Sequence, residues 1–334
     1  MAELAIRWQA RKLEVQVSSD HDHHHGIGHV HGSTHGPRLV ASLVLTIIFV
    51  IGEGIAGFRA NSLALMSDAG HNASDALALG LAAYAIWAAR KPANKRKTYG
   101  YHRVAILTAL FNAVSLVVIA AVIFVEAGHL FLRPEPVQGN LMVWVALVSV
   151  FMNTVIAWAL SAGAKESLNM RAAFVHMAGD ALSAVAVVIA GLVVKQTGWL
   201  YADPLVSVLI GLFILYTAWG IVKEATNILL EASPKGLDVD RMVEAMKGVP
   251  SVCSVHDVHV WTVSDGMHYL SCHVELAENS NIQDSTKVIQ ELSELLAHEF
   301  DISHATIQTE LEGTCEPTGD SPTFCEETAA PHRH

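Results

Sequence analysis

The sequence predicts an all-α bundle of six transmembrane helices followed by a small α+β domain of ferredoxin-like type, with the element order αββαβ. The chain is too apolar for an ordinary soluble protein, because its mean hydropathy is +0.37 and only 16% of its residues are charged. The apolar residues cluster in stretches of about 20 residues, the length that crosses a hydrocarbon core of about 30 Å. From about residue 232 onward, shorter amphipathic and alternating patterns replace them.

The apolar stretches together predict one membrane domain over residues 38–231. No cleaved signal peptide is expected, because the basic residues near the N-terminus precede a polar histidine-rich tract rather than an apolar segment. The expected spans cover residues 38–58, 64–89, 104–131, 141–163, 172–195 and 201–223.

Basic residues predict the orientation of the bundle in the membrane. They gather in the connection after the second span and are scarce in the connections after the first, third and fifth spans. Because basic loops stay in the cytoplasm, this connection is expected there, and an even number of spans then places both termini in the cytoplasm. The bases concerned are Arg90, Lys91, Lys95, Arg96, Lys97 and Arg103.

Two terminal segments have compositions that cannot form a packed core. Residues 1–37 include seven histidines interleaved with Gly, Asp and Ser between positions 20 and 35, which predicts a disordered cytoplasmic segment that captures metal loosely. An engineered tag is the alternative origin of these histidines. Residues 313–334 are expected to form a flexible C-terminal tail.

Residues 232–312 predict a cytoplasmic α+β domain for metal binding and dimerisation. Helices are expected at 238–247 and 286–300, and strands at 255–263, 268–276 and 305–311. The net charge of −11 is concentrated in this part of the chain. Such a surface repels nucleic acid and attracts cations, although it also serves simply to keep a domain soluble.

Ionisable residues inside two of the expected spans are the most informative feature. The second span contains Asp68, His71 and Asp75, and the fifth contains His176 and Asp180. An uncompensated charge inside the membrane costs several kcal/mol, so these residues need partners.

Each span carries the pattern H-x-x-x-D, as His71 with Asp75 and His176 with Asp180. Residues four apart share one helical face, so two packed helices would present two imidazoles and two carboxylates to one place. That donor set suits Zn²⁺, while its imidazoles disfavour Mg²⁺ and Ca²⁺ and its lack of sulfur disfavours Cu(I). Cd²⁺, Co²⁺, Ni²⁺ and Fe²⁺ stay possible, and polar contacts within the bundle are the structural alternative.

The chain resembles the cation diffusion facilitators, especially the bacterial type that exports zinc, cadmium and cobalt. The resemblance covers residues 38–312 and agrees with the order of six spans and a following α+β domain. The segments that carry it are SLALMSDAGHNASDALALGLA, KRKTYGYHR, HMAGDALSAVAVVIAG, VHDVHVW and TIQTE.

This resemblance implies a homodimer that exports cytoplasmic Zn²⁺ in exchange for protons by alternating access, in zinc homeostasis and metal resistance. It implies no enzymatic activity, and a bacterial inner membrane as the location. It assigns the transport site to His71, Asp75, His176 and Asp180. Members that favour Mn²⁺ generally lack the histidine of the second span, so His71 points toward zinc.

Further metal sites are implied in the cytoplasmic parts. The family's regulatory site falls on His256, His273 and Glu310, with Zn²⁺ as a structural or regulatory ion. In a regular strand His256, Val258 and Val260 share one face and Asp257 and His259 the other, so His259 needs a different role or a second site. Gln308, where some members carry a histidine or carboxylate ligand, leaves a binuclear centre in doubt.

Weaker candidate ligands are His102, in the motif YGYHR, and the tail cysteines Cys315 and Cys325. The neighbouring ligands that some relatives place beside His102 are replaced here by Lys95, Arg96 and Lys97. A cytoplasmic location argues against disulfides, so the cysteines are expected to be free thiols or ligands.

Two functions of other classes are compatible with the sequence. An intramembrane metalloenzyme would need an open zinc position and a general base, and the sequence contains no H-E-x-x-H motif. A membrane metal sensor that does not transport would share the same ligands, so only measured flux distinguishes it.

Overall fold

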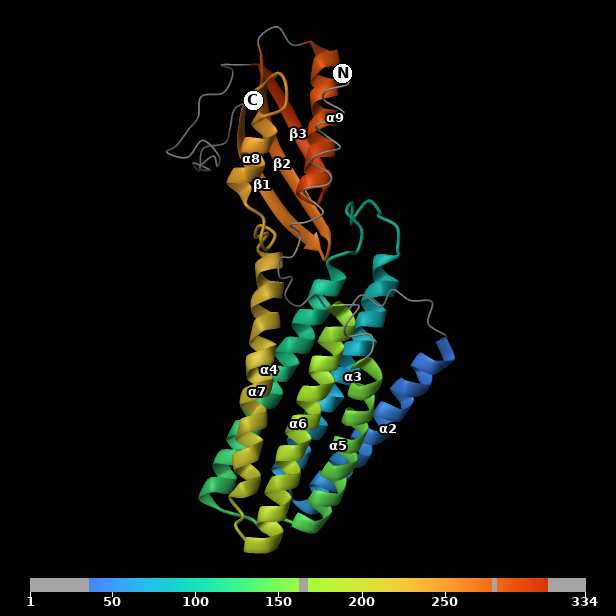
Figure 1. Cartoon of the computed structure of the whole chain (residues 1–334), viewed down its shortest axis with the longest axis vertical. Coiled ribbons are helices and arrows are strands. Elements are labelled where there is room, and N and C mark those ends of the chain that lie inside the picture. Colours follow the sequence, from blue (N-terminus) through green and yellow to red (C-terminus); the bar gives the residue numbers. More distant parts are fainter. Residues whose placement is uncertain (1–35, 162–167, 278–280, 312–334) are drawn as a thin grey trace.

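A computed structural model describes residues 36–161, 168–277 and 281–311 of the chain. Six long helices form a bundle at one end, and a small α+β unit stands at the other (Figure 1). The expected histidine-rich segment up to residue 35 and the tail from 312 onward lie outside the described residues. The helices of the bundle are α2 (Gly36–Ala60), α3 (Leu63–Ala89), α4 (Val104–Leu132), α5 (Gly139–Ser161), α6 (Leu168–Thr197) and α7 (Ala202–Leu229).

Four of these helices, α4 to α7, are long and apolar enough to cross a membrane by length and composition. Helix α3 carries Asp68, His71, Asn72 and Asp75, which lower its mean hydropathy. The prediction of six spans also includes α2 and α3, which length and composition alone do not select among the described residues.

Small residues bring the helices of the bundle close together. Helices α5 and α6 pack along their length, and a Cβ atom added at Gly191 of α6 would lie 2.8 Å from Val143 Cγ2 and 3.2 Å from the Val143 nitrogen of α5. Alanines with almost no exposed surface, such as Ala64, Ala120 and Ala146, lie in the same core. Close helix approach in membranes requires such residues, because bulky side chains would separate the backbones.

A buried carboxylate fixes the beginning of α3 against α7. Asp203 accepts hydrogen bonds from the Ser62 hydroxyl, from the Leu63 N–H at 2.7 Å and from the Ala64 N–H at 3.3 Å. Ser62 itself caps α3, since its side chain accepts from the Leu65 N–H. The first N–H groups of a helix have no intrahelical partners, and a negative charge beside them is stabilised by the helix dipole. Asp203 is therefore a structural cap, which positions α3.

The α+β unit has the element order that the sequence predicts. Its sheet has the strand order β1-β2-β3, with β1 and β2 antiparallel and β2 and β3 parallel. Both helices contribute to one core with the strands, through Met242 of α8 and Leu292 of α9. The elements are α8 (Val239–Lys247), β1 (Val252–Ser264), β2 (Met267–Leu276), α9 (Ile282–Glu299) and β3 (Ile302–Leu311).

Helix α9 begins four residues before the expected position 286. Asn281 accepts hydrogen bonds from the N–H groups of Gln283 and Asp284, and the Asp284 side chain accepts from the Asn281 N–H. This capping box satisfies N–H groups that the helix leaves unpaired. The polar residues before 286 therefore extend the helix instead of forming a loop.

The expected alternation along β1 is wrong at its centre. Asp257 has a positive φ of 51°, and the pairing with β2 shifts between His256 and His259. This β-bulge inserts one residue, so Val255, Val258 and Val260 all face the core while His256 pairs with His273 of β2. His256 therefore does not share a face with Val258 and Val260, as a regular strand would require.

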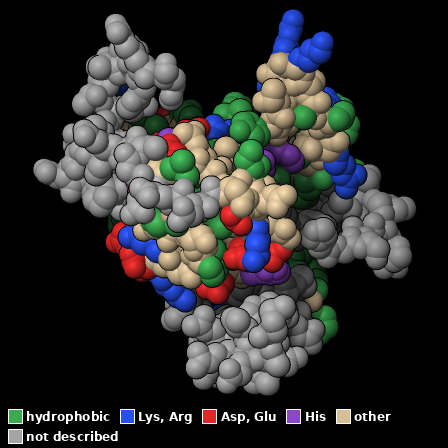
Figure 2. Space-filling model, turned by 90° about the horizontal axis from the view of Figure 1, so that it is seen from above, with side chains coloured by type: hydrophobic (Ala, Val, Ile, Leu, Met, Phe, Trp, Pro, Cys, Tyr) green, Lys and Arg blue, Asp and Glu red, His purple; other side chains and the backbone are tan. Residues whose placement is uncertain are grey.

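The connection between α3 and α4 meets the α+β unit. Arg103, at the end of this connection, lies 2.9 Å from Glu231, which follows α7. The Tyr99 ring contacts the Tyr269 ring of β2 edge to face, with centroids 5.5 Å apart. Viewed from the end that carries the α+β unit, the surface shows acidic and basic side chains interspersed (Figure 2).

We expect Gly191→Ala to destabilise the protein by about 1–3 kcal/mol, because the added methyl group would force α5 and α6 apart. Thermal unfolding of the full chain in lipid nanodiscs measures the effect. Gly220→Ala in α7 is the matched control, since a Cβ atom there meets nothing within 4 Å. Equal unfolding temperatures for the two variants would contradict the close packing at Gly191.

Candidate metal sites

The structure brings the four candidate ligands of the bundle together between α3 and α6. His71 Nε2 lies 3.2 Å from Asp180 Oδ1, and His176 Nε2 lies 3.3 Å from Asp75 Oδ2. Within each helix, the histidine and the aspartate four residues later are 3.6 Å apart at their closest atoms. Each imidazole therefore contacts a carboxylate of its own helix and one of the other helix.

These spacings fit one small cation with nitrogen and oxygen ligands. In a tetrahedral zinc site with bonds of 2.0–2.1 Å, neighbouring ligand atoms lie about 3.4 Å apart. The imidazole-to-carboxylate distances of 3.2–3.6 Å are close to that value. Ligand atoms of His71, Asp75 and Asp180 all lie within 4.8 Å of one another, and His176 reaches both carboxylates from the open side.

The exposure of the four side chains falls in one direction along the bundle. The His176 and Asp75 side chains are 44% and 30% exposed, whereas those of His71 and Asp180 are 7% and 2% exposed. Helix α3 ends and α6 begins near the α+β unit (Figure 1), so the more exposed pair lies one helical turn closer to that unit. The cluster is therefore most open on the side of the α+β unit.

Further polar residues of the bundle lie around this cluster. Asp68 accepts from the hydroxyls of Ser149 and Ser183, and Ser74 donates to Asn112 Oδ1 at 3.2 Å. Ser149 and Ser183 could not be identified from the sequence, because a serine in an apolar helix commonly bonds only to its own backbone.

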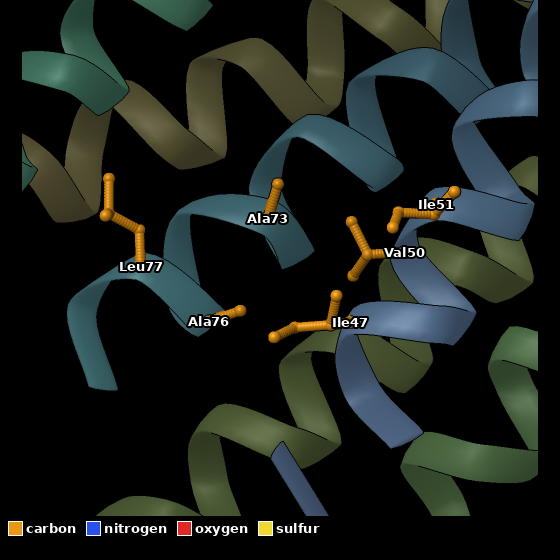
Figure 3. A pocket seen from close by; sticks show the side chains of 6 residues that line it. All are labelled: Ile47, Val50, Ile51, Ala73, Ala76 and Leu77. Atoms are coloured by element: carbon orange, nitrogen blue, oxygen red, sulfur yellow. The ribbon is translucent and has the colours of Figure 1, made fainter. Parts of the chain in front are cut away.

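An apolar hollow of about 280 Å³ lies between α2 and α3, away from the ligands. Six apolar side chains line it, and none of them offers a ligand atom (Figure 3). This hollow is unsuited to a cation. Its lining consists of Ile47, Val50, Ile51, Ala73, Ala76 and Leu77.

A second cluster of potential ligands lies on the sheet of the α+β unit. Ligand atoms of His256, His273 and Glu310 lie within 4.8 Å of one another, with His273 Nδ1 2.9 Å from Glu310 Oε1. His256 Nε2, His273 Nδ1 and Glu310 Oε2 are buried and have no partner of hydrogen-bond geometry among the described residues. Buried polar atoms normally have partners, and a metal ion would satisfy these three atoms.

The bulge in β1 adds a residue to this second cluster that alternation had placed elsewhere. Asp257 Oδ2 lies 3.7 Å from His273 Nε2, and Asp257 Oδ1 lies 3.1 Å from His259 Nε2. His259, with a 55% exposed side chain, stands at the edge and reaches the cluster only through Asp257. Gln308 donates to Glu310 Oε1 at 2.8 Å and so orients that carboxylate.

The remaining candidates do not join a cluster. His102 belongs to no group of three or more potential ligands among the residues that the structure describes. Cys315 and Cys325 lie outside those residues. Burial, together with the nearby Asp257, raises the pKa of the Cys272 thiol to about 12. That thiol is therefore protonated at neutral pH and is a poor metal ligand.

Two family models match the chain. Residues 39–230 match the cation efflux transmembrane domain, and residues 234–312 match the cytoplasmic domain of cation efflux proteins. A solved structure, the metal-bound C-terminal domain of the CzcD transporter from Cupriavidus metallidurans, is 35% identical and covers 22% of this chain and 100% of that chain, with a TM-score of 0.21.

Two curated relatives are similar along most of their length. The cadmium, cobalt and zinc/H(+)-K(+) antiporter of Bacillus subtilis (strain 168) is 34% identical over 289 residues, which are 86% of this chain and 93% of the relative. Zinc transporter ZitB of Escherichia coli (strain K12) is 36% identical over 294 residues, which are 87% of this chain and 93% of the relative. The chain belongs to the cation efflux family of membrane transporters, the cation diffusion facilitators.

Proposed function

We propose that this protein exports Zn²⁺, or a closely similar divalent cation, from the cytoplasm in exchange for protons, as a homodimer that works by alternating access. The observation that carries the proposal is the convergence of His71, Asp75, His176 and Asp180 between α3 and α6. The relatives, a zinc transporter and a cadmium, cobalt and zinc antiporter, support the same cargo class.

The donor chemistry favours Zn²⁺ within that class. Two neutral imidazoles and two carboxylates carry a charge of about −2, which a divalent cation neutralises without further groups. If all four side chains bind one ion, no position is left for an activated water, which favours binding and release rather than hydrolysis. Cd²⁺ and Co²⁺ accept the same ligands and are expected as weaker or alternative cargoes.

All six long helices cross the membrane in this proposal, as residues 38–231, and residues 232–312 form the cytoplasmic domain. The outer surface of α2 supports its inclusion, because Ile48, Ile51, Ile55 and Phe58 are more than half exposed, as suits contact with lipid. Basic loops stay in the cytoplasm, so we infer a cytoplasmic location for the basic α3–α4 connection and for the α+β unit that it touches. The proposed membrane is a bacterial plasma membrane.

Cytoplasmic access to the site follows from the exposure of its ligands. The more exposed His176 and Asp75 face the α+β unit, while the buried His71 and Asp180 lie deeper in the bundle. A cation arriving from the cytoplasm would meet the exposed pair first. In this proposal the structure represents a state open to the cytoplasm, and a rearrangement of the helices exposes the site to the opposite side.

Proton coupling follows from the chemistry of the ligands. An imidazole binds metal only when it is deprotonated, and a protonated imidazole beside a carboxylate keeps the empty site close to neutral. Protons and the metal therefore exclude one another. Exchange results if the metal-filled and the protonated forms change conformation, while the empty ionised form does not.

The second cluster serves regulation in this proposal. His256, His273 and Glu310 hold a Zn²⁺ ion whose binding favours the dimer of cytoplasmic domains. Asp257 and His259 extend the cluster, and they offer ligands for a second ion beside the first.

Replacing one ligand of the bundle site should abolish transport. We expect Asp180→Asn to lower Zn²⁺ uptake into proteoliposomes at least about a hundredfold, because the amide offers no negative charge to the cation. Glu126→Gln, at an exposed position of α4, is the matched control and should leave uptake unchanged. If Asp180→Asn took up Zn²⁺ as fast as the wild type, Asp180 would not belong to the transport site. If the wild type bound Zn²⁺ without transporting it, the protein would be a sensor.

A pH gradient should drive the transport. In inverted membrane vesicles, an acidic interior is expected to accelerate Zn²⁺ uptake, and collapsing the gradient with a protonophore is expected to slow it. The physical reason is that protons leaving the vesicle displace metal from the ligands on the inner side. Uptake that is indifferent to the gradient would contradict proton exchange.

The cytoplasmic cluster should account for Zn²⁺ bound outside the bundle. We expect the full-length double variant His256→Ala/His273→Ala to bind about one Zn²⁺ fewer per chain than the wild type, since it lacks two of three ligands. His298→Ala, an exposed histidine of α9, is the control. Native mass spectrometry counts the ions, and an unchanged count in the double variant would show that the cluster binds none.

A further inference from the structure

A pair of buried acids lies beside the four candidate metal ligands and is not part of that ligand set. Glu53 of α2 and Asp68 of α3 are each only 1% exposed, and their carboxyl groups lie close enough to interact directly. Neither acid forms an ion pair with a lysine or arginine among the described residues. Two carboxyl groups thus meet in the interior of a membrane bundle without a basic partner.

The protein supplies hydrogen-bond donors to three of the four carboxyl oxygens. Asp68 Oδ1 accepts from the Ser183 hydroxyl at 3.1 Å and Asp68 Oδ2 accepts from the Ser149 hydroxyl at 3.2 Å. Glu53 Oε2 accepts from the Asn72 amide at 3.0 Å. Glu53 Oε1 is buried and has no donor among the described residues. This oxygen lacks the partner that buried polar atoms normally have.

A proton shared by the two acids supplies the missing partner. An ionised carboxylate only accepts hydrogen bonds, so two of them cannot bond to each other unless one is protonated. Two adjacent carboxylates in a medium of low dielectric constant also repel each other strongly, and a single retained proton removes this cost. A metal ion fits less well, because the amide and the hydroxyls already direct their donors at the carboxyl oxygens.

We propose that Glu53 and Asp68 form a proton-binding site that holds one proton while the metal ligands are empty and releases it to solvent when Zn²⁺ binds. The inference rests on the proposed transport function and adds a proton carrier distinct from the metal ligands. The site is built from α2, α3, α5 and α6 and lies deeper in the bundle than the exposed pair Asp75 and His176.

Two features couple this site to the metal ligands. Asp68 lies three residues before His71, almost one turn along α3, so a divalent cation bound to His71 favours the ionised carboxylate by direct attraction. Ser183 lies 3.1 Å from Asp68 Oδ1 and 3.0 Å from the backbone oxygen of Asp180. Its hydroxyl has one proton to donate, so it turns toward whichever oxygen carries more negative charge.

The other ionisable groups around the pair belong to the metal site. His71 lies three residues after Asp68 on α3, and the backbone oxygen of Asp180 on α6 accepts from the Ser183 hydroxyl. From α5, the neutral Ser149 hydroxyl donates to Asp68. A cation bound to His71 and Asp180 adds positive charge close to the acid pair. The shared proton therefore responds to the occupancy of the metal site.

The experiment is to count protons released per Zn²⁺ bound. Full-length protein in lipid nanodiscs is titrated with Zn²⁺ near neutral pH by calorimetry in buffers of different ionisation enthalpy. We expect the double variant Glu53→Gln/Asp68→Asn to release about one proton fewer per Zn²⁺ than the wild type, because neither amide titrates. Glu126→Gln, another glutamate of the bundle, should release as many protons as the wild type. Equal release by the double variant and the wild type would overturn the proposal.

Infrared difference spectroscopy supplies an independent test that does not require transport. Metal-free wild type should show a protonated carboxyl band that Zn²⁺ removes and that is weaker in Glu53→Gln, a variant that keeps the size and polarity of the side chain. A metal-free spectrum identical in the wild type and Glu53→Gln would overturn the shared proton. If the wild type bound no Zn²⁺, the proposed function would fail, and the metal-free spectra would still decide whether the proton is present.

Discussion

The structure depends on the high cost of a charge inside an apolar bundle. Four ionisable side chains lie between α3 and α6, and each imidazole contacts a carboxylate from both helices. A low-dielectric surrounding penalises each charge alone, so the groups are stable only as a mutually compensating set or with a bound cation. The rest of the bundle holds this set in place. Asp203 fixes the start of α3, and glycine and alanine allow the helices to approach.

The two clusters bring histidine and carboxylate side chains together by different means, one between helices and the other across a sheet. In the bundle, helical periodicity places His71 and Asp75 on one face, so sequence spacing and geometry agree. In the α+β unit, ligands come from three strands and depend on which residues are paired across the sheet. The bulge at Asp257 reverses the side-chain alternation there and brings His256 beside His273. Each half of the site between the helices follows from the spacing of four residues along one helix. The site on the sheet depends in addition on which residues of neighbouring strands are paired.

Metal and proton chemistry are closely linked in this bundle. In the proposed mechanism, the four candidate ligands bind Zn²⁺ only when their imidazoles are neutral, and the buried acids Glu53 and Asp68 keep one proton when no cation is bound. In both cases metal binding is accompanied by the loss of a proton. In the proposed mechanism, a bound divalent cation releases protons from the neighbouring groups, and its departure lets these groups bind protons again. A bundle with few basic residues in its interior can in this way stay near neutrality in both states.

The sequence alone determined the membrane character, the α+β unit and the pairing of His71, Asp75, His176 and Asp180, because hydropathy and helical spacing act over short distances along the chain. It also indicated His256, His273 and Glu310, through resemblance. Only the tertiary structure decided that Asp257 joins them, that α9 begins at Ile282, and that Ser149 and Ser183 serve Asp68. It likewise decided that Asp203 caps α3. These features depend on a bulge, a cap and contacts between distant helices, and such contacts are set by packing rather than by any local pattern.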